Sequence, residues 1–375
     1  MPRVLAQDTL YGETRFHAAF PSIARFSDDH LVLAFRRARD GLWLVPAAKR
    51  VGFDPLARVD HLDSRSHIAL MELDPAGQQR SEGLELLPFN PEAADQDPSL
   101  LCLPDDRLFL ASFSYYPLPS DIDALMRGRS ETQDEQAGCR YLSWGSHASL
   151  RHRARDSWRY HHAYLRPDQG YGRALGVEEY QPTVGAVRGQ PLWRDGEILL
   201  GVYWGSQEGC ALFASADSGE SWRYRSRIAR DDEAKVAFQE PAFCAYGDKG
   251  MVCFMRTSGA GGRLATTRST DGLQWSEPRL HALIGHPFHP LPLADGRVLL
   301  SYGYRKRPYG IRLRVLDNAL ADPDRAEEFV VRDDGVCADV GYPWAVQLAD
   351  GNVLLVYYWT DPQGRRQILG SWLEI

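Results

Sequence analysis

A single pattern of polar and hydrophobic positions recurs along the chain and predicts most of its secondary structure. Each copy is a short polar turn built on an aspartate and followed directly by a run of β-branched, leucine and aromatic residues. Aspartate and glycine tolerate the positive φ of a tight turn, and the apolar run has the composition of a strand, so each copy predicts a β-hairpin. The six turns are centred on Asp29, Asp106, Asp195, Asp248, Asp295 and Asp350. Six hairpins predict six similar sheets.

The spacing of these hairpins indicates how the sheets combine. The aspartates lie about 50 to 90 residues apart, close to the length of a propeller blade that carries insertions. The chain is therefore predicted to be all-β, a six-bladed β-propeller of four-stranded antiparallel sheets. A second repeat agrees with this, because residues 215–222 and 269–275 each place a polar turn before a tryptophan. Such a tryptophan can pack beneath its turn, between neighbouring sheets.

Composition limits the domain organisation and the partners. No tract of Gly, Ser or Pro resembling a linker interrupts the repeats, so residues 1–375 are predicted to form one domain. The region 117–173 has little periodicity and is predicted to be an irregular insertion over one face. The formal net charge of −7 argues against nucleic acid or an anionic membrane as the main partner. No apolar run has the length of a signal peptide or a membrane span, which predicts a cytoplasmic protein.

Candidate chemistry follows from the propeller prediction, since the ends of the innermost strands converge on the axis. The segments ending at Arg39, Phe243, Arg256, Arg305 and Trp344, together with the aspartate turns, resemble those of the sialidase superfamily of six-bladed propeller glycosidases. The likeness spans essentially the whole chain. It implies an exo-acting glycoside hydrolase whose partner is a glycan ending in an acidic sugar, such as sialic acid, Kdo or Kdn. It implies no cofactor and no metal.

The resemblance implies a catalytic pair formed by a tyrosine and a glutamate. Tyr342 matches the nucleophile of the family and Glu240 matches the glutamate that activates it. A phenol with a pKa of about 10 attacks poorly until a carboxylate accepts its proton, and a neutral nucleophile avoids repulsion from an anionic sugar. Taken singly, Tyr342 also fits an ordinary strand aromatic and Glu240 a surface charge. Their order among the arginines favours catalysis.

The acid/base of the family is an aspartate in a loop after the first hairpin, and Asp63 occupies that loop. A carboxylic acid there can protonate the leaving-group oxygen and later deprotonate water. Asp40, Asp95 and Asp97 remain alternatives, Asp97 because it lies where the second hairpin unit begins.

Three arginines bind the substrate carboxylate in the family, since a guanidinium group matches a carboxylate through two parallel hydrogen bonds. Arg256 and Arg305 match the second and third of them. Ala19 stands where the first is expected. The further arginines available for this anion site are Arg36, Arg37 and Arg39, of which Arg39 matches a family position. Either Arg36 or Arg37 supplies the missing charge, or the substrate lacks a carboxylate of the sialic type.

The alanine at position 19 leaves two other functions open. One is a propeller exo-glycosidase or lyase acting on a neutral or uronic-acid glycan, and some enzymes of that kind use histidine. The other is a carbohydrate-binding propeller without turnover. The histidines, which include His286 and His289, have no acidic partners at ligand spacing, so a metal site is not predicted.

Overall fold

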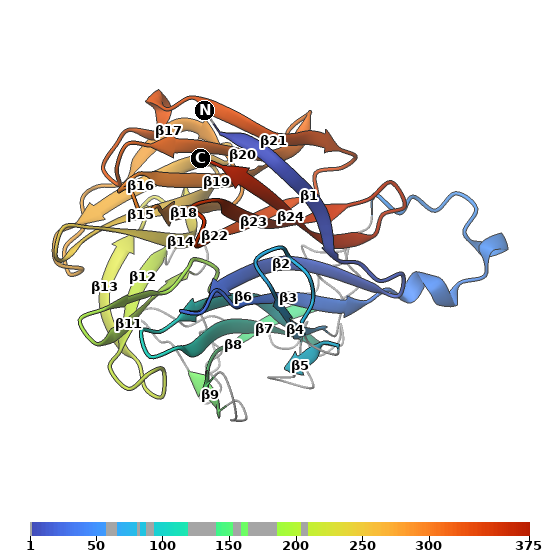
Figure 1. Ribbon diagram of the computed structural model, residues 1–375, viewed down its shortest axis with the longest axis horizontal. Coiled ribbons are helices and arrows are strands. Elements are labelled where there is room, and N and C mark those ends of the chain that lie inside the picture. Colours follow the sequence, from blue (N-terminus) through green and yellow to red (C-terminus); the bar gives the residue numbers. More distant parts are fainter. Residues whose placement is uncertain are drawn as a thin grey trace.

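The computed structural model describes residues 2–57, 66–80, 83–87, 94–118, 140–152, 159–163, 186–203 and 209–375. The protein is an all-β propeller with four-stranded antiparallel blades (Figure 1). Each of the six predicted aspartate turns joins two consecutive antiparallel strands, so the hairpin prediction is confirmed. Asp29, Asp106 and Asp195 have positive φ values of 67°, 59° and 51° at these turns.

Four sheets contain four strands each. The first consists of β10 (Leu192–Arg194), β11 (Glu197–Tyr203), β12 (Cys210–Ser215) and β13 (Arg223–Ala229). The second consists of β14 (Ala237–Tyr246), β15 (Gly250–Ser258), β16 (Arg263–Ser269) and β17 (Arg279–Ile284). The third consists of β18 (Phe288–Pro292), β19 (Val298–Tyr304), β20 (Tyr309–Leu316) and β21 (Glu328–Gly335). The fourth consists of β22 (Gly341–Gln347), β23 (Val353–Thr360), β24 (Arg366–Glu374) and β1 (Arg3–Tyr11).

The N-terminal strand β1 completes the sheet that holds the C-terminal strand β24. The two strands are antiparallel, with Arg3 opposite Glu374. An ion pair of 2.8 Å joins the same two side chains, and Figure 1 shows the two termini close together. The ring of sheets is therefore closed by pairing between the two ends of the sequence.

The fifth sheet has eight strands, and it corrects the predicted number of blades. Its strands are β2 (Phe16–Arg25), β3 (Leu31–Arg39), β4 (Ser66–Leu73), β5 (Glu85–Leu87), β6 (Ala94–Cys102), β7 (Arg107–Leu118), β8 (Arg140–His152) and β9 (Arg159–Ala163). Strands β4 and β6 are parallel and join at Ser66 and Ala94, and the Ser66 hydroxyl donates to the Asp95 carbonyl at 2.6 Å. The prediction of six separate blades is thus wrong: the described strands form five sheets, because the first two hairpin units share one.

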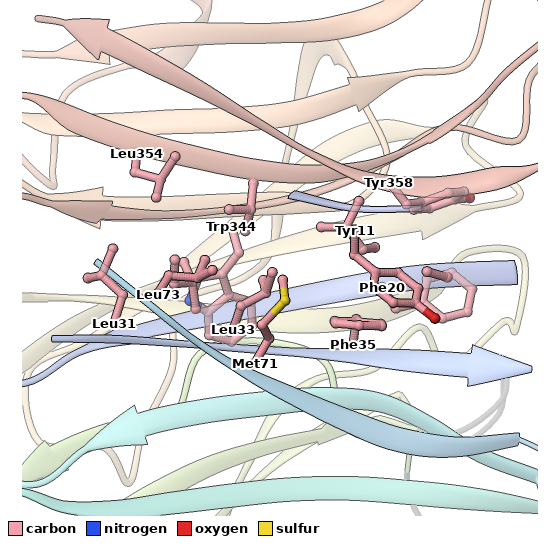
Figure 2. Packing of buried hydrophobic residues seen from close by; sticks show 14 of the residues in the cluster. Tyr11, Phe20, Leu31, Leu33, Phe35, Met71, Leu73, Trp344, Leu354 and Tyr358 are labelled. Atoms are coloured by element: carbon pink, nitrogen blue, oxygen red, sulfur yellow. The ribbon is translucent and has the colours of Figure 1, made fainter. Parts of the chain in front are cut away.

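Apolar side chains of the described residues pack in six clusters. Figure 2 shows the cluster in which Phe35 and Met71 of the eight-stranded sheet face Trp344 and Leu354 of the sheet that contains both termini. Alternation along each strand sends these residues to one face. Burial of each large apolar side chain stabilises the fold by about 1.5–3 kcal/mol. The clusters fix each sheet against its neighbours.

The two repeats of a polar turn before a tryptophan have the predicted local structure. Asp217 accepts hydrogen bonds from the Ser221 amide at 2.9 Å and the Ser215 hydroxyl at 2.7 Å. In the second repeat, the indole N–H of Trp275 donates to the hydroxyl of Ser226 at 3.0 Å. Ser226 belongs to β13, so this turn is tied to the neighbouring sheet.

Three short 3-10 helices complete the described structure: η1 (Gly41–Leu44), η2 (Ala47–Lys49) and η3 (Pro323–Arg325). The first two lie in the light-blue segment that extends away from the sheets between β3 and β4 (Figure 1). Within the predicted insertion at 117–173, the described residues belong to β7, β8 and β9. No helix in the described part of the chain is long and apolar enough to span a bilayer.

Candidate active site

Four strands share a local feature near their start: the residue before a proline adopts the left-handed backbone conformation. These residues are Phe20 (φ 56°), Asp97 (φ 35°), Glu240 (φ 54°) and Tyr342 (φ 52°), in β2, β6, β14 and β22. The strand register shifts at each of these positions, because proline cannot donate a hydrogen bond to the next strand. Left-handed backbone is strained for residues other than glycine, and such strain is concentrated at functional sites.

Two of these residues meet across the propeller. The hydroxyl of Tyr342 donates a hydrogen bond of 2.5 Å to Oε1 of Glu240. Arg256, on β15 beside Glu240, donates from Nη1 to the same carboxylate oxygen at 3.1 Å and to the Tyr342 oxygen at 3.3 Å. The structure therefore brings together three of the predicted site residues.

Burial sets the protonation of this group. It raises the pKa of Tyr342 well above the ordinary value, and the negative charge of Glu240 adds to the rise, whereas Arg256 and Arg305 oppose it. The phenol is thus neutral in the resting protein and needs a base to become a nucleophile. The carboxylate of Glu240 is the group that accepts the hydrogen bond of the phenol. Its other oxygen, Oε2, is buried and has no hydrogen-bond partner among the described residues.

Arg305 is a second guanidinium group close to the Tyr342 ring. Its guanidinium carbon is 5.3 Å from the centre of the Tyr342 ring. The same group donates to the Val340 carbonyl at 3.0 Å and to the Tyr358 hydroxyl at 2.5 Å. Tyr358 in turn donates to Asp339 at 2.7 Å. These contacts fix the guanidinium group beside Tyr342, where its positive charge can attract an anionic ligand.

An aromatic residue and a histidine complete the surroundings of Tyr342. The Phe20 ring lies 4.7 Å from the Tyr342 ring, centre to centre, and the His286 ring lies edge-on to it at 6.4 Å. Burial holds the pKa of His286 well below its ordinary value, and the charges of Arg305 and Arg256 lower it further. His286 is therefore neutral at neutral pH.

Asp97 is the second carboxyl group near this centre. Its side chain is buried, and burial raises its pKa from 3.8 to about 7. The positive charge of Arg188 lowers the pKa and the negative charge of Glu240 raises it, so Asp97 interacts electrostatically with the site. A carboxyl group that titrates near neutrality can both donate and accept a proton at physiological pH.

The other predicted aspartates have different surroundings. Asp63 lies outside the described residues. Asp40 accepts from the Leu42 amide at 2.9 Å and lies 3.4 Å from His17, at the start of η1. Asp95 accepts from the Ser114 hydroxyl at 2.6 Å. Both are thus engaged in local structure.

Among the described residues, no contact joins Arg37 to Tyr342. Its guanidinium donates to the Tyr11 hydroxyl at 2.6 Å and to Glu13 at 3.1 Å. Arg39 is exposed at the end of β3. Arg36 pairs with Ala19 across β2 and β3 and is fully buried, and its charge influences Asp97. Of the three arginines on β3, Arg36 is therefore the one directly opposite Ala19, the position of the missing arginine.

Three residues near Tyr342 were not selected as site residues from the sequence: Asp97 was only an alternative for the acid/base, and Phe20 and Arg188 were not candidates. The sequence does contain a signal for Asp97 and Phe20, because each precedes a proline near the start of a strand, as Glu240 and Tyr342 do. Arg188 carries no such signal, since it lies between strands.

One group of side chains has the composition of a metal site. Ligand atoms of His281, Asp322 and Asp324 lie within 4.8 Å of one another. Asp322 is already paired with Arg279 at 2.7 Å. Asp324 accepts from the Ala282 amide at 2.9 Å and lies 3.2 Å from His281. These bonds connect β17 to η3, so the group has a structural role.

The chain is thus an all-β propeller in which a tyrosine, a glutamate and an arginine from different strands are joined by hydrogen bonds. The chain is 32% identical to a Dyadobacter fermentans protein of unknown function, over 100% of this chain and 99% of that one, with a TM-score of 0.84. The chain belongs to the same family as that protein. No family model matches the chain, and no curated protein matches it either.

Sialidases share the fold at much lower identity. A mutant of the NanB sialidase of Streptococcus pneumoniae is 12% identical over 96% of this chain and 68% of its own, with a TM-score of 0.62. The Hadza microbial sialidase Hz136 is 13% identical over 95% of this chain and 65% of its own, with a TM-score of 0.64.

Proposed function

We propose that the protein is an exo-acting glycoside hydrolase of the sialidase type, which cleaves a terminal acidic sugar such as sialic acid, Kdo or Kdn. The observation that carries the proposal is the hydrogen bond of 2.5 Å between Tyr342 and Glu240, with Arg256 donating to both oxygens. The Tyr342 phenol has both a base to accept its proton and a cation to stabilise the charge that develops on it. Tyr302 also bonds a carboxylate and a guanidinium group, but Tyr342 and Glu240, unlike Tyr302, lie in left-handed backbone.

The first chemical step transfers the sugar to the protein. The Tyr342 oxygen attacks the anomeric carbon while its proton moves to Glu240, and the bond from that carbon to the leaving-group oxygen breaks. A carboxylic acid protonates the departing oxygen. In the second step the same carboxylate takes a proton from water, whose oxygen displaces Tyr342, and the phenol recovers its proton from Glu240.

The acid/base in this proposal is Asp63, and Asp97 is its rival. Asp97 has the titration that the role requires, since burial raises its pKa to about 7. Its side chain is only 4% exposed, however, and a general acid must reach the leaving group. Asp63 is therefore retained as the proton donor.

The anion pocket is proposed to contain Arg256, Arg305 and Arg39, with Arg37 outside it. The side chain of Arg256 is 19% exposed, so a substrate can reach it. Both Arg256 and Arg305 lower the pKa of Tyr342, and this supports the proposal that their charges would also stabilise a bound carboxylate.

A second candidate function is favoured by Ala19 and His286. Without the first arginine the site has less positive charge than a sialidase clamp, and a neutral histidine lies edge-on to Tyr342. That arrangement suits a hydrolase or lyase for a uronic or neutral sugar, in which His286 accepts a proton from the sugar ring.

The experiment that tests these functions is a substrate panel. Aryl ketosides of sialic acid, Kdo and Kdn are compared with aryl uronides and neutral aryl glycosides, and released phenol and unsaturated product are both measured. Hydrolysis of a ketoside supports the proposal. Turnover of uronides alone, or an unsaturated product, supports the second function. Binding without turnover of any substrate would make the protein a carbohydrate-binding propeller.

A further inference from the structure

Arg188 is a buried cation at the centre of the described structure that has no part in the proposed chemistry. It follows Val187 in the segment leading to β10, and only 2% of its surface is exposed. A buried guanidinium group is expensive unless several acceptors surround it. Its partners therefore indicate its role.

These partners are three backbone carbonyl groups from two other strands. Nη1 donates to the Phe20 carbonyl at 3.3 Å, and Nη2 donates to the carbonyls of Pro21 and Tyr342 at 2.9 and 3.0 Å. Phe20 and Tyr342 are both left-handed residues that precede a proline. Register shifts at these places interrupt the ladders of β2 and β22, and Arg188 supplies hydrogen bonds to the carbonyls there.

The guanidinium group of Arg188 also lies close to two aromatic rings of β22. Its carbon lies 5.1 Å from the centre of the Tyr342 ring and 5.2 Å from that of Trp344. Attraction between a cation and these ring faces restricts their movement. Asp97 is a source of opposite charge for Arg188. Backbone and ring of the tyrosine are thus both held by one residue from outside β2 and β22.

We propose that Arg188 is a positioning residue for Tyr342, which ties the interrupted regions of β2 and β22 together and thereby aims the phenol at Glu240. This inference rests on the proposed function only for its effect on turnover. Its structural content is independent of the substrate. The left-handed conformation at Tyr342 is strained for a residue other than glycine, and the hydrogen bond from Arg188 to the Tyr342 carbonyl helps to offset that strain. Without it, rotation of this peptide would move the phenol away from Glu240.

The test compares Arg188→Met and Arg188→Lys with a matched control, Arg25→Met. Arg25 donates to the Gln347 carbonyl at 2.7 Å and so also links β2 to β22, at the other end of both strands. The lysine variant keeps the charge and one donor, and serves if the methionine variant fails to fold. Each protein carries 3-fluorotyrosine at position 342, and its fluorine NMR signal is recorded along with kcat and KM for the best substrate of the panel.

The expected result is a shifted or broadened fluorine signal in both Arg188 variants and an unchanged signal in the Arg25 variant. Turnover should fall by about 10- to 100-fold in kcat, with KM changed less than about 3-fold, because a misplaced nucleophile slows chemistry more than binding. An unchanged fluorine signal in folded Arg188 variants would overturn the proposal. So would a rise in KM at constant kcat. If the wild-type protein cleaves nothing on the panel, the proposed function fails while the fluorine signal still decides the positioning role.

Discussion

The hydroxyl of Tyr342 is hydrogen-bonded to Glu240 although the two residues are 102 positions apart in the sequence and belong to different sheets. Each lies before a proline, in left-handed backbone, at an interruption of its strand. A pairing that requires strain in both partners is better explained by chemistry than by stability.

Tyr342→Phe and Glu240→Gln are each expected to lower kcat by roughly 10²- to 10⁴-fold, since each removes one half of a proton transfer coupled to attack. The double variant should be little worse than either single variant, because the two groups act as a unit. Initial rates on an aryl glycoside that the wild-type protein cleaves give kcat for the three variants.

A matched control exists in the same chain. Tyr302 is a buried tyrosine that donates to Glu328 at 2.5 Å, on β19 and β21. Tyr302→Phe should leave kcat unchanged. Equal losses in the Tyr302 and Tyr342 variants would contradict the assignment of the nucleophile.

The stability of the protein is expected to depend on pH through Asp97. Its pKa is about 7 in the folded protein, against an ordinary value of 3.8, so the folded state binds more protons than the unfolded state between these pH values. The stabilisation present below pH 4 is therefore lost as the pH rises through 7. Asp97→Asn should raise the free energy of unfolding at pH 8 relative to wild type by about 1–4 kcal/mol.

Urea unfolding at pH 5 and pH 8 measures that difference. Asp248→Asn, at an exposed turn residue, serves as the control and should leave the pH dependence of wild type in place. The interpretation of Asp97 fails if Asp97→Asn retains the full loss of stability between pH 5 and pH 8.

Arg305→Lys should raise KM for an acidic aryl glycoside by roughly 10-fold and change KM for a neutral one much less, because an ammonium group cannot reproduce the planar guanidinium contacts. Steady-state kinetics on both substrates separate the two effects. Arg332→Lys is the control, as Arg332 pairs with Asp334 at 2.8 Å and lies over Trp359. A similar rise in KM for both substrates would indicate that Arg305 supports the fold rather than an anion pocket.

Trp275→Phe and Ser226→Ala are each expected to lower the free energy of unfolding by about 1 kcal/mol, since they remove the hydrogen bond between neighbouring sheets. The double variant should lose less than the sum of the two, as coupled partners do. Chemical unfolding provides the free energies, and activity should stay unchanged. Strict additivity would show that this hydrogen bond contributes nothing.

The hairpins were predictable because their causes are local. The positive φ at Asp29 and Asp106 and the apolar strands behind them follow from neighbouring residues alone. The number of sheets was not predictable in this way, since the joining of β4 to β6 through Ser66 and Ala94 is a contact between two strand edges.

Tyr342, Glu240 and Arg256 could be selected because a resemblance supplied their order, whereas Arg37 was a candidate that the structure pairs with Tyr11 and Glu13 instead. Neighbours two positions apart on a strand share a face, but the pattern gives no information on which strand lies opposite.

The sequence by itself determined the strands, their turns and the residues capable of the chemistry, because backbone preferences and side-chain alternation act over a few positions. Only the tertiary structure decided which of these residues meet. The packing of separate sheets brings Tyr342 of β22 to Glu240 of β14 and brings the guanidinium group of Arg188 to the Tyr342 carbonyl. Such contacts depend on the packing of whole sheets, and no stretch of sequence contains both partners.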